Sequence, residues 1–178
     1  MSARILPVDE SNATEELKDV YEKIKSGFGG VPNVFKTIGH KPKALSAFFA
    51  LTGVLFSDNS ITPKIRELAV LMTSMVNQCH YCIFHHTAMG KKAGLTEEQI
   101  SAIPAYKDSR LFTDEEKSVL AYAECMTLDA EHIPDGVFAA LKRSFYSDDK
   151  IVLLTMIIGL FQIFNKLNGA LKVELEKA

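Results

Sequence analysis

The chain has 178 residues, the length of one domain, and can bury a substantial hydrophobic core without disulfide bonds. Its net charge is −2 and its basic residues are scattered, which excludes a basic surface for nucleic acid or anionic lipid. The N-terminal residues soon turn polar and acidic, so we expect no signal peptide. The longest apolar run, Ile151 to Phe164, is too short to span a membrane and predicts a buried core helix. These features predict a single cytoplasmic domain over residues 1–178, with no nucleic-acid or membrane partner.

The composition also favours self-association. Hydrophobic residues make up 47% of the chain, with eleven Phe and six Met among the large side chains. An all-helical domain of this size leaves part of that apolar surface exposed, which indicates a homo-oligomer. Three cysteines are too few for the disulfide framework of a secreted protein. In a reducing cytoplasm a close pair of cysteines is more often catalytic or metal-binding.

Helix signals dominate the first part of the chain. A short amphipathic segment starts at Thr14 and runs to about Lys25, where the glycines and proline of GFGGVPNVF break the pattern. Pro42 is well placed to start the next helix, PKALSAFFALTGVLF. Thr62 as N-cap, with Pro63 in the first helical position, predicts the start of a third.

The same signals continue to the end of the chain. The segment after Asn77 ends at Gly94, a residue that commonly closes a helix. Capping boxes at Thr96 and Thr113 start two more helices, PDGVFAALKRSF predicts a short one, and Ser147 caps the last. Alternating β-branched runs with hairpin turns are absent from the sequence. The prediction is therefore an all-α domain of seven or eight helices.

The segment NQCHYCIFHHTAMGKKAG, residues 77–94, holds two of the three cysteines and three of the five histidines. If residues 79–93 are helical, Cys79, Cys82 and His86 share one stripe of that helix and His85 does not. The polar break before the helix puts both cysteines in its first turn, where unpaired N–H groups and the helix dipole favour a thiolate. An adjacent imidazole can accept the thiol proton, and a second cysteine can convert a sulfenic acid into a disulfide. The pattern therefore predicts thiol chemistry.

Two other interpretations of the cysteine segment stay open. A zinc site would use Cys79, Cys82 and one or two histidines, but zinc wants four ligands and no second ligand pair follows. Chance clustering in a buried helix is the other. We expect His80 and His85 to be surface or interface residues rather than ligands, and we expect neither a metal nor a cofactor.

Two further residues receive ordinary structural interpretations from the pattern alone. Glu67 shares a polar face of the preceding helix with Lys64 and Ser74, which predicts a solvated ion pair. Cys125, in LAYAECMTL, is predicted to be a small apolar core residue.

Glu67, Cys79, Cys82 and His86 together form the motif E-x11-C-x-x-C-x3-H. It resembles the core motif of alkyl hydroperoxidase D (AhpD), an all-helical protein of the carboxymuconolactone decarboxylase superfamily. The segments GGVPNVFKTIGHKPKALSAFFAL, TDEEKSVLAYAECMT and FQIFNKLNGAL look like those of the branch called peroxidase-related enzymes. The resemblance covers nearly the whole chain.

The resemblance implies a cofactor-free thiol peroxidase with peroxiredoxin-type activity on hydrogen peroxide or organic hydroperoxides, reduced by an unknown thiol donor. Cys82 matches the cysteine that attacks the peroxide, and Cys79 matches its resolving partner. His86 and Glu67 match the proton relay. The same resemblance implies a trimer or a hexamer.

One position departs from the AhpD pattern. AhpD carries a histidine immediately before the second cysteine, and here that residue is Tyr81. Its phenol is a poor base but can still donate or relay a hydrogen bond, so Tyr81 stays a candidate site residue. The decarboxylase branch generally lacks the cysteine pair, so its presence argues against decarboxylation. A non-catalytic redox sensor and a metal-binding helical protein stay open as alternatives.

Overall fold

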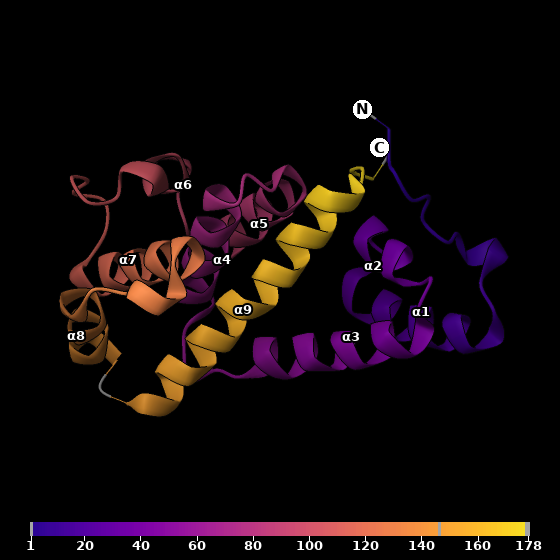
Figure 1. The fold of residues 1–178 in the computed structure, drawn as a ribbon, viewed down its shortest axis with the longest axis horizontal. Coiled ribbons are helices and arrows are strands. Elements are labelled where there is room, and N and C mark those ends of the chain that lie inside the picture. Colours follow the sequence, from indigo (N-terminus) through magenta and orange to yellow (C-terminus); the bar gives the residue numbers. More distant parts are fainter. Residues whose placement is uncertain (1, 146, 177–178) are drawn as a thin grey trace. The chain divides into compact units, whose positions relative to one another are not determined.

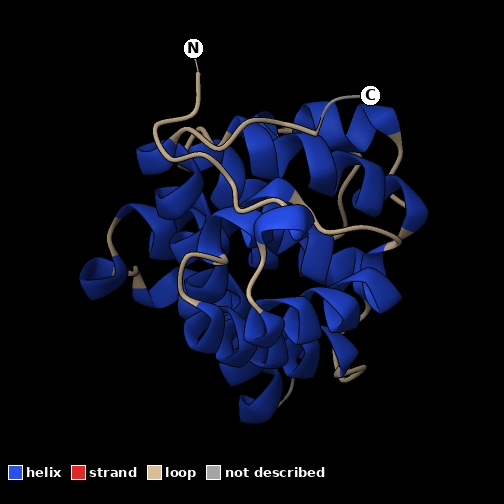
Figure 2. Ribbon diagram, turned by 90° about the vertical axis from the view of Figure 1, so that its right-hand side faces the viewer, coloured by secondary structure: helices blue, strands red, loops and turns tan. Residues whose placement is uncertain are grey.

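The computed structural model describes residues 2–145 and 147–176 of the chain. These residues form nine α-helices and three short 3₁₀ helices, and no strand occurs among them (Figures 1 and 2). The all-α prediction is confirmed. The α-helices are α1 (Glu15–Phe28), α2 (Asn33–Ile38), α3 (Pro42–Ser57), α4 (Pro63–Val76), α5 (His80–Lys92), α6 (Glu97–Ala102), α7 (Asp114–Leu128), α8 (Asp135–Phe145) and α9 (Asp148–Leu171).

The additional helix is α2, which lies in the segment predicted to be a break. Gly29 adopts the left-handed conformation, with φ at 73°, and ends α1 three residues beyond the predicted end at Lys25. Pro32 then occupies the N-cap position of α2, where its missing N–H costs no helical hydrogen bond. The glycine and proline signals therefore marked a short interruption between two helices rather than a long loop.

The helix starts predicted at four threonines are confirmed in detail. The side chains of Thr14, Thr62, Thr96 and Thr113 each accept a hydrogen bond from the backbone N–H three residues later. The last two form complete capping boxes. Such caps satisfy amide groups that a helix end would otherwise leave without a partner, which is why short polar residues mark these boundaries so clearly.

The chain divides into two compact units. Their membership of a single domain, as expected from the sequence, stays a prediction. The first unit runs to Ser57 and resumes at Leu167, and it contains α1, α2 and α3. In this unit the rings of Phe28, Phe35 and Phe49 meet with centroids 5.7–6.4 Å apart. Edge-to-face contacts of this kind add to the stability gained by burial.

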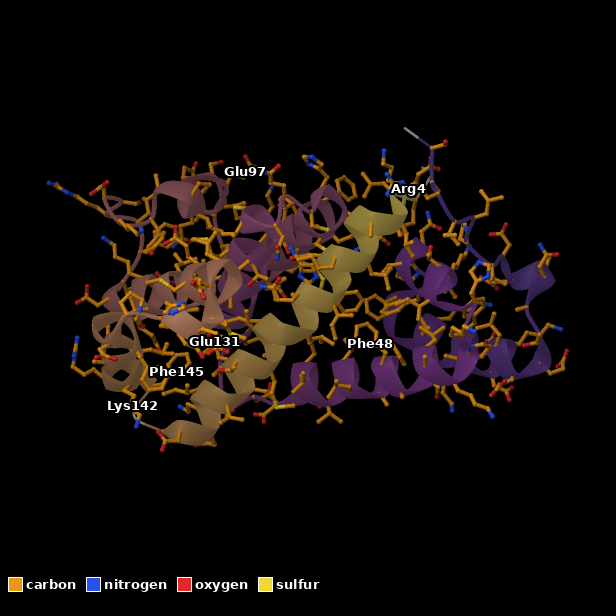
Figure 3. The ribbon with its side chains drawn as sticks, viewed as in Figure 1. Arg4, Phe48, Glu97, Glu131, Lys142 and Phe145 are labelled. Carbon is orange, nitrogen blue, oxygen red and sulfur yellow. The ribbon has the colours of Figure 1, made fainter. Side chains whose placement is uncertain are left out.

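The second unit, Asp58–Lys166, contains the cysteine segment and is built around α4. Every residue of α4 from Glu67 to Ser74 is buried, and the helix packs against both α5 and α7. A helix that is buried on all sides over two turns is typical of a protein core. Within the same unit, α8 buries Phe145 and leaves Lys142 half-exposed, and both residues are labelled in Figure 3.

The apolar run from Ile151 to Phe164 lies within α9, as predicted. The helix has 24 residues, so by length and composition alone it is long enough to cross a membrane, contrary to the expectation from the run itself. However, 56% of its apolar window is buried inside the protein, as in a core helix. The buried hydrophobic residues of α9 are Ile151, Leu153, Leu154, Ile157, Ile158, Leu160, Phe161 and Phe164.

Candidate active site

The candidate site begins at the tight connection between α4 and α5. Asn77 closes α4, and Gln78 adopts the left-handed conformation with φ at 54°, which is uncommon for a residue other than glycine. The backbone N–H of Cys79 then donates a hydrogen bond to the carbonyl of Ser74, at 2.9 Å. The chain reverses within these few residues, and Cys79 becomes the N-cap residue of α5 rather than its first helical residue.

The two cysteines occupy the N-cap and third helical positions of α5, the same two positions that face each other in a capping box. Each of the two residues is only 4% exposed. The N–H groups of a first helical turn have no partner within the helix, and together with the helix dipole they favour a negative charge there. Cys82 lies in the first turn as predicted, whereas Cys79 comes just before it as the N-cap, and both positions are close to the amide groups that favour a thiolate.

Glu67 and His86 form a buried pair directly between α4 and α5. Oε2 of Glu67 lies 2.7 Å from Nδ1 of His86, and Glu67 is 2% exposed. The solvated ion pair predicted for Glu67 is therefore wrong, because α4 has no solvent face at this position. Lys64 instead pairs with Glu116 of α7 at 2.6 Å. A carboxylate that accepts the Nδ1 proton leaves Nε2 of the imidazole as the basic atom.

Close helix packing makes this contact possible. Gly90 lies one turn after His86, and a Cβ atom there would be 3.0 Å from Leu95 Cδ1 and 3.4 Å from Leu71 Cδ1. Glycine therefore lets α5 approach α4 at the level of Glu67. On its other side the His86 ring meets Phe161 of α9 edge-on, with centroids 4.7 Å apart. The imidazole is held between a carboxylate and an aromatic ring.

The C-terminal end of α5 is also firmly fixed. Gly94 is left-handed with φ at 97°, its N–H donates to Lys91, and the N–H of Leu95 donates to Gly90. This pair of bonds is a Schellman motif, which satisfies carbonyls at the helix end. The predicted role of Gly94 as helix terminator is confirmed.

The remaining polar and aromatic residues of α5 differ in how far they are exposed. Tyr81 is buried, 7% exposed, and its ring lies against that of His85 with centroids 4.6 Å apart. His80 is exposed, as expected of a surface residue, and His85 is half-buried. Phe84 is 60% exposed on the same helix.

A cluster of polar residues beside the turn was missed by the sequence analysis. Asn77, Gln162, Asn165 and Lys166 are joined by hydrogen bonds of 2.8–3.1 Å, and Asn165 also donates to Ser74 Oγ at 3.2 Å. The signal that could have found them is the presence of amides inside the apolar pattern of FQIFNKLNGAL, because a buried amide needs specific partners.

Cys125 does not lie in the core as predicted. It is half-buried in the last turn of α7 and lines an open groove of about 970 Å³. Burial, and then the negative charge of Glu124, raise the pKa of its thiol, whereas Lys107 acts in the opposite direction. None of the residues that line this groove belongs to the cysteine pair or to the pair of Glu67 and His86.

The structure gives no support to the zinc interpretation. Within residues 2–145 and 147–176, no group of three or more His, Cys, Asp or Glu side chains lies together in a way that could hold a metal ion. A structural zinc site needs four such ligands.

Comparison with known proteins identifies the family. The carboxymuconolactone decarboxylase family matches residues 42–124, a range that includes the whole motif from Glu67 to His86. The uncharacterized protein YdfG of Bacillus subtilis is 31% identical over 114 residues, which cover 64% of this chain and 77% of that protein.

Two solved structures have the same fold. The chain is similar to the alkylhydroperoxidase AhpD core of an uncharacterized peroxidase-related protein from Ralstonia eutropha JMP134, with a TM-score of 0.81 and 25% identity over 98% of this chain and 93% of that one. It is also similar to the debrominase Bmp8 in complex with 2,3,4-tribromopyrrole, with a TM-score of 0.84 and 21% identity over 99% of this chain and 93% of that one. The chain belongs to the carboxymuconolactone decarboxylase family and has the AhpD-like fold.

Proposed function

We propose that this protein is a cofactor-free thiol peroxidase that reduces hydrogen peroxide or small organic hydroperoxides through Cys79 and Cys82. The observation that carries the proposal is the contact of 2.7 Å between the buried Glu67 of α4 and His86 of α5. The same helix α5 begins with the two cysteines. Burying a carboxylate costs free energy that a single histidine partner offsets only in part, and groups of this kind concentrate at active sites. The peroxidase-related solved relative supports the same class of reaction.

The proposed reaction consumes one peroxide and two thiols. His86 accepts the proton of the Cys82 thiol, and the thiolate attacks the peroxide, so that an S–O bond forms and the O–O bond breaks. The departing alkoxide takes up that proton and leaves as an alcohol, or as water if the substrate is hydrogen peroxide. Cys79 then attacks the sulfenic acid sulfur, a disulfide forms, and water leaves with the second thiol proton.

A thiol donor from solution completes the cycle by reducing the disulfide with two electrons. Glu67 serves as a positioning residue in this scheme, because it holds the Nδ1 proton of His86 and keeps Nε2 available as the base. Tyr81 is assigned a hydrogen-bonding role rather than a basic one, since a phenol is a poor base at neutral pH.

The place of action and the assembly are part of the same proposal. The solved relatives with this fold support a soluble protein, and we place it in the cytoplasm, where thiol reductants are available. Self-association into a trimer or a hexamer would cover exposed apolar side chains such as Phe84, Val152 and Ile163.

Reductive debromination is a second candidate, favoured by the similarity to Bmp8 over 99% of the chain. Two thiols can also supply the two electrons that replace a C–Br bond by C–H. In that reaction bromide leaves, a proton is taken up by carbon, and the same disulfide forms. The two candidates thus share the thiol pair and differ only in substrate.

The test is steady-state consumption of hydrogen peroxide and of tert-butyl hydroperoxide with dithiothreitol as reductant. We expect turnover in the wild type and in Cys125→Ser, and none above background in Cys82→Ser. A parallel assay with 2,3,4-tribromopyrrole measures bromide release. Bromide release without peroxide turnover would replace the first candidate by the second. A disulfide that forms without turnover on either substrate would leave a redox sensor, and stoichiometric zinc in the purified protein would leave a metal-binding protein.

A further inference from the structure

The polar cluster beside the α4–α5 turn links the thiol pair to the last helix. Asn77 Nδ2 donates to Gln162 Oε1 at 2.8 Å and to Asn165 Oδ1 at 3.1 Å, and Asn77 Oδ1 accepts from Lys166 Nζ at 2.8 Å. Asn165 Nδ2 donates in turn to Ser74 Oγ at 3.2 Å. All these residues belong to the second unit. The turn is therefore held by side chains about 88 residues further along the chain.

Asn165 is the central member of this cluster. It is 3% exposed, and it contacts both ends of the turn, Ser74 on one side and Asn77 on the other. An amide in the middle of an apolar helix is unfavourable unless its donors and acceptors are matched. Here Nδ2 donates to Ser74 and Oδ1 accepts from Asn77. The side chain of Asn165 therefore favours one arrangement of the turn, whereas a leucine would contribute packing alone.

The cluster stabilises a strained connection. Gln78 is left-handed, a conformation that disfavours residues with a Cβ atom. Ser74 contributes twice, because its carbonyl accepts from the N–H of Cys79 while its hydroxyl accepts from Asn165. Fixing Ser74 and Asn77 therefore fixes the backbone that leads into Cys79.

We propose that Asn165 is a positioning residue for the thiol pair, acting through Ser74 and Asn77 to keep Cys79 at the N-cap of α5. A disulfide forms without strain only if the two Cα atoms lie within a narrow window of separation, about 4.4–6.8 Å. Cys82 is fixed by the helix, so the separation depends on where the turn places Cys79. The cluster thus sets the stability of the disulfide. The inference rests on the proposed function, in which this disulfide forms in each cycle.

The experiment measures the equilibrium between the dithiol and the disulfide in glutathione redox buffers, without any peroxide. In Asn165→Ala we expect the equilibrium constant for disulfide formation to fall about tenfold, equivalent to about 30 mV for a two-electron couple. Gln162→Met removes one acceptor of Asn77 with a neutral side chain of similar size, and we expect a fall of about twofold to threefold. The Gln162 variant decides the question if Asn165→Ala fails to fold, since Gln162 is only half-buried.

Thr155→Val is the matched control. It removes a hydrogen bond of 2.8 Å between Thr155 and Tyr122, also made by α9 inside the second unit, but away from the turn. We expect it to lower stability without changing the redox equilibrium. Equal equilibrium constants in the wild type and the cluster variants would overturn the proposal, as would an equal fall in Thr155→Val. A shifted equilibrium together with absent peroxide turnover would support the positioning role and reject the peroxidase function.

Discussion

The cysteine pair and Cys125 lie in the same unit but in opposite environments. Cys79 and Cys82 are 4% exposed and begin α5, the helix that also carries His86, the partner of Glu67. Cys125 is more exposed, lines an open groove, and lies in the last turn of α7, where the helix dipole disfavours a negative charge. Burial and the charge of Glu124 raise its thiol pKa further. At Cys125 the helix end and the nearby carboxylate oppose a thiolate, whereas at the more deeply buried pair burial opposes it and the start of the helix favours it.

We expect helix position and charged neighbours, rather than exposure, to decide which cysteine reacts with peroxide. An open groove gives access but does not create a nucleophile. A thiol pair with so little exposed surface is instead suited to small oxidants, which is why hydrogen peroxide and small hydroperoxides are the proposed substrates.

The largest effects are expected from removing each thiol in turn. Cys82→Ser should abolish the reaction with peroxide, because the attacking sulfur is gone. Cys79→Ser should still consume one equivalent and stop at a sulfenic or more oxidised product, since no resolving thiol is present. Cys125→Ser should behave as the wild type. Mass spectrometry after alkylation distinguishes these states. Oxidation of Cys125 before Cys79 and Cys82 would contradict the assignment of the pair as the reactive thiols.

The next test removes the charge of Glu67. Glu67→Gln keeps the shape of the side chain but loses the carboxylate that supports the imidazole. We expect peroxide turnover at neutral pH to fall by about 10²–10⁴-fold, the usual value of general-base assistance. Part of the rate should return as pH rises, because thiolate then forms without the relay. Glu97→Gln, at an exposed carboxylate that pairs with Lys91, is the control and should change nothing. Superimposable pH–rate profiles for Glu67→Gln and the wild type would reduce Glu67 to a structural residue.

A smaller effect is expected from widening the contact between α4 and α5. In Gly90→Ala the new methyl group meets Leu95 and Leu71, so the free energy of unfolding should fall by about 1 kcal/mol despite the better helix propensity. Gly159→Ala in α9, where nothing lies within 4 Å of the new atom, should raise it by about 0.5–1 kcal/mol. Urea denaturation measures both. A stabilised Gly90→Ala with full turnover would show that close approach is unnecessary.

The smallest expected effect concerns Cys125 itself. The negative charge of Glu124 raises the pKa of this thiol, so Glu124→Gln should lower it and increase the thiolate fraction at pH 8. We expect alkylation of Cys125 to become about twofold faster, because burial remains the larger cause and Lys107 already offsets part of the charge. Alkylation of Cys82, followed in the same samples, is the internal reference. A slower reaction of Cys125 would contradict the electrostatic explanation.

The sequence predicted local features better than long-range ones. The caps at Thr62, Thr96 and Thr113 were recognisable because the cap and its amide are three residues apart. The environment of Glu67 was not, because a pattern argument assumes a solvent face and α4 has none there. The resemblance to AhpD, rather than periodicity, singled out Glu67.

The hydrogen bonds from α9 to the turn could not be predicted from the sequence, for a different reason. Nothing local to Asn77 indicates that its partners lie on the last helix, and a single sequence offers no way to pair them. Cys125 was misplaced because its neighbours in LAYAECMTL are apolar, although the groove beside them is open.

The distance along the chain between Asn77 and Asn165 also has a consequence during protein synthesis. Residues 63–92, which carry both cysteines, Glu67 and His86, leave the ribosome well before α9. At about 5–20 residues per second, the 88 residues between the two asparagines take about 4–18 s to add. Throughout that interval the nascent turn lacks the amides that will hold it, and Cys79 has no fixed position. The newly made chain therefore passes through a stage in which both thiols are present but the side chains of α9 that hold the turn are not.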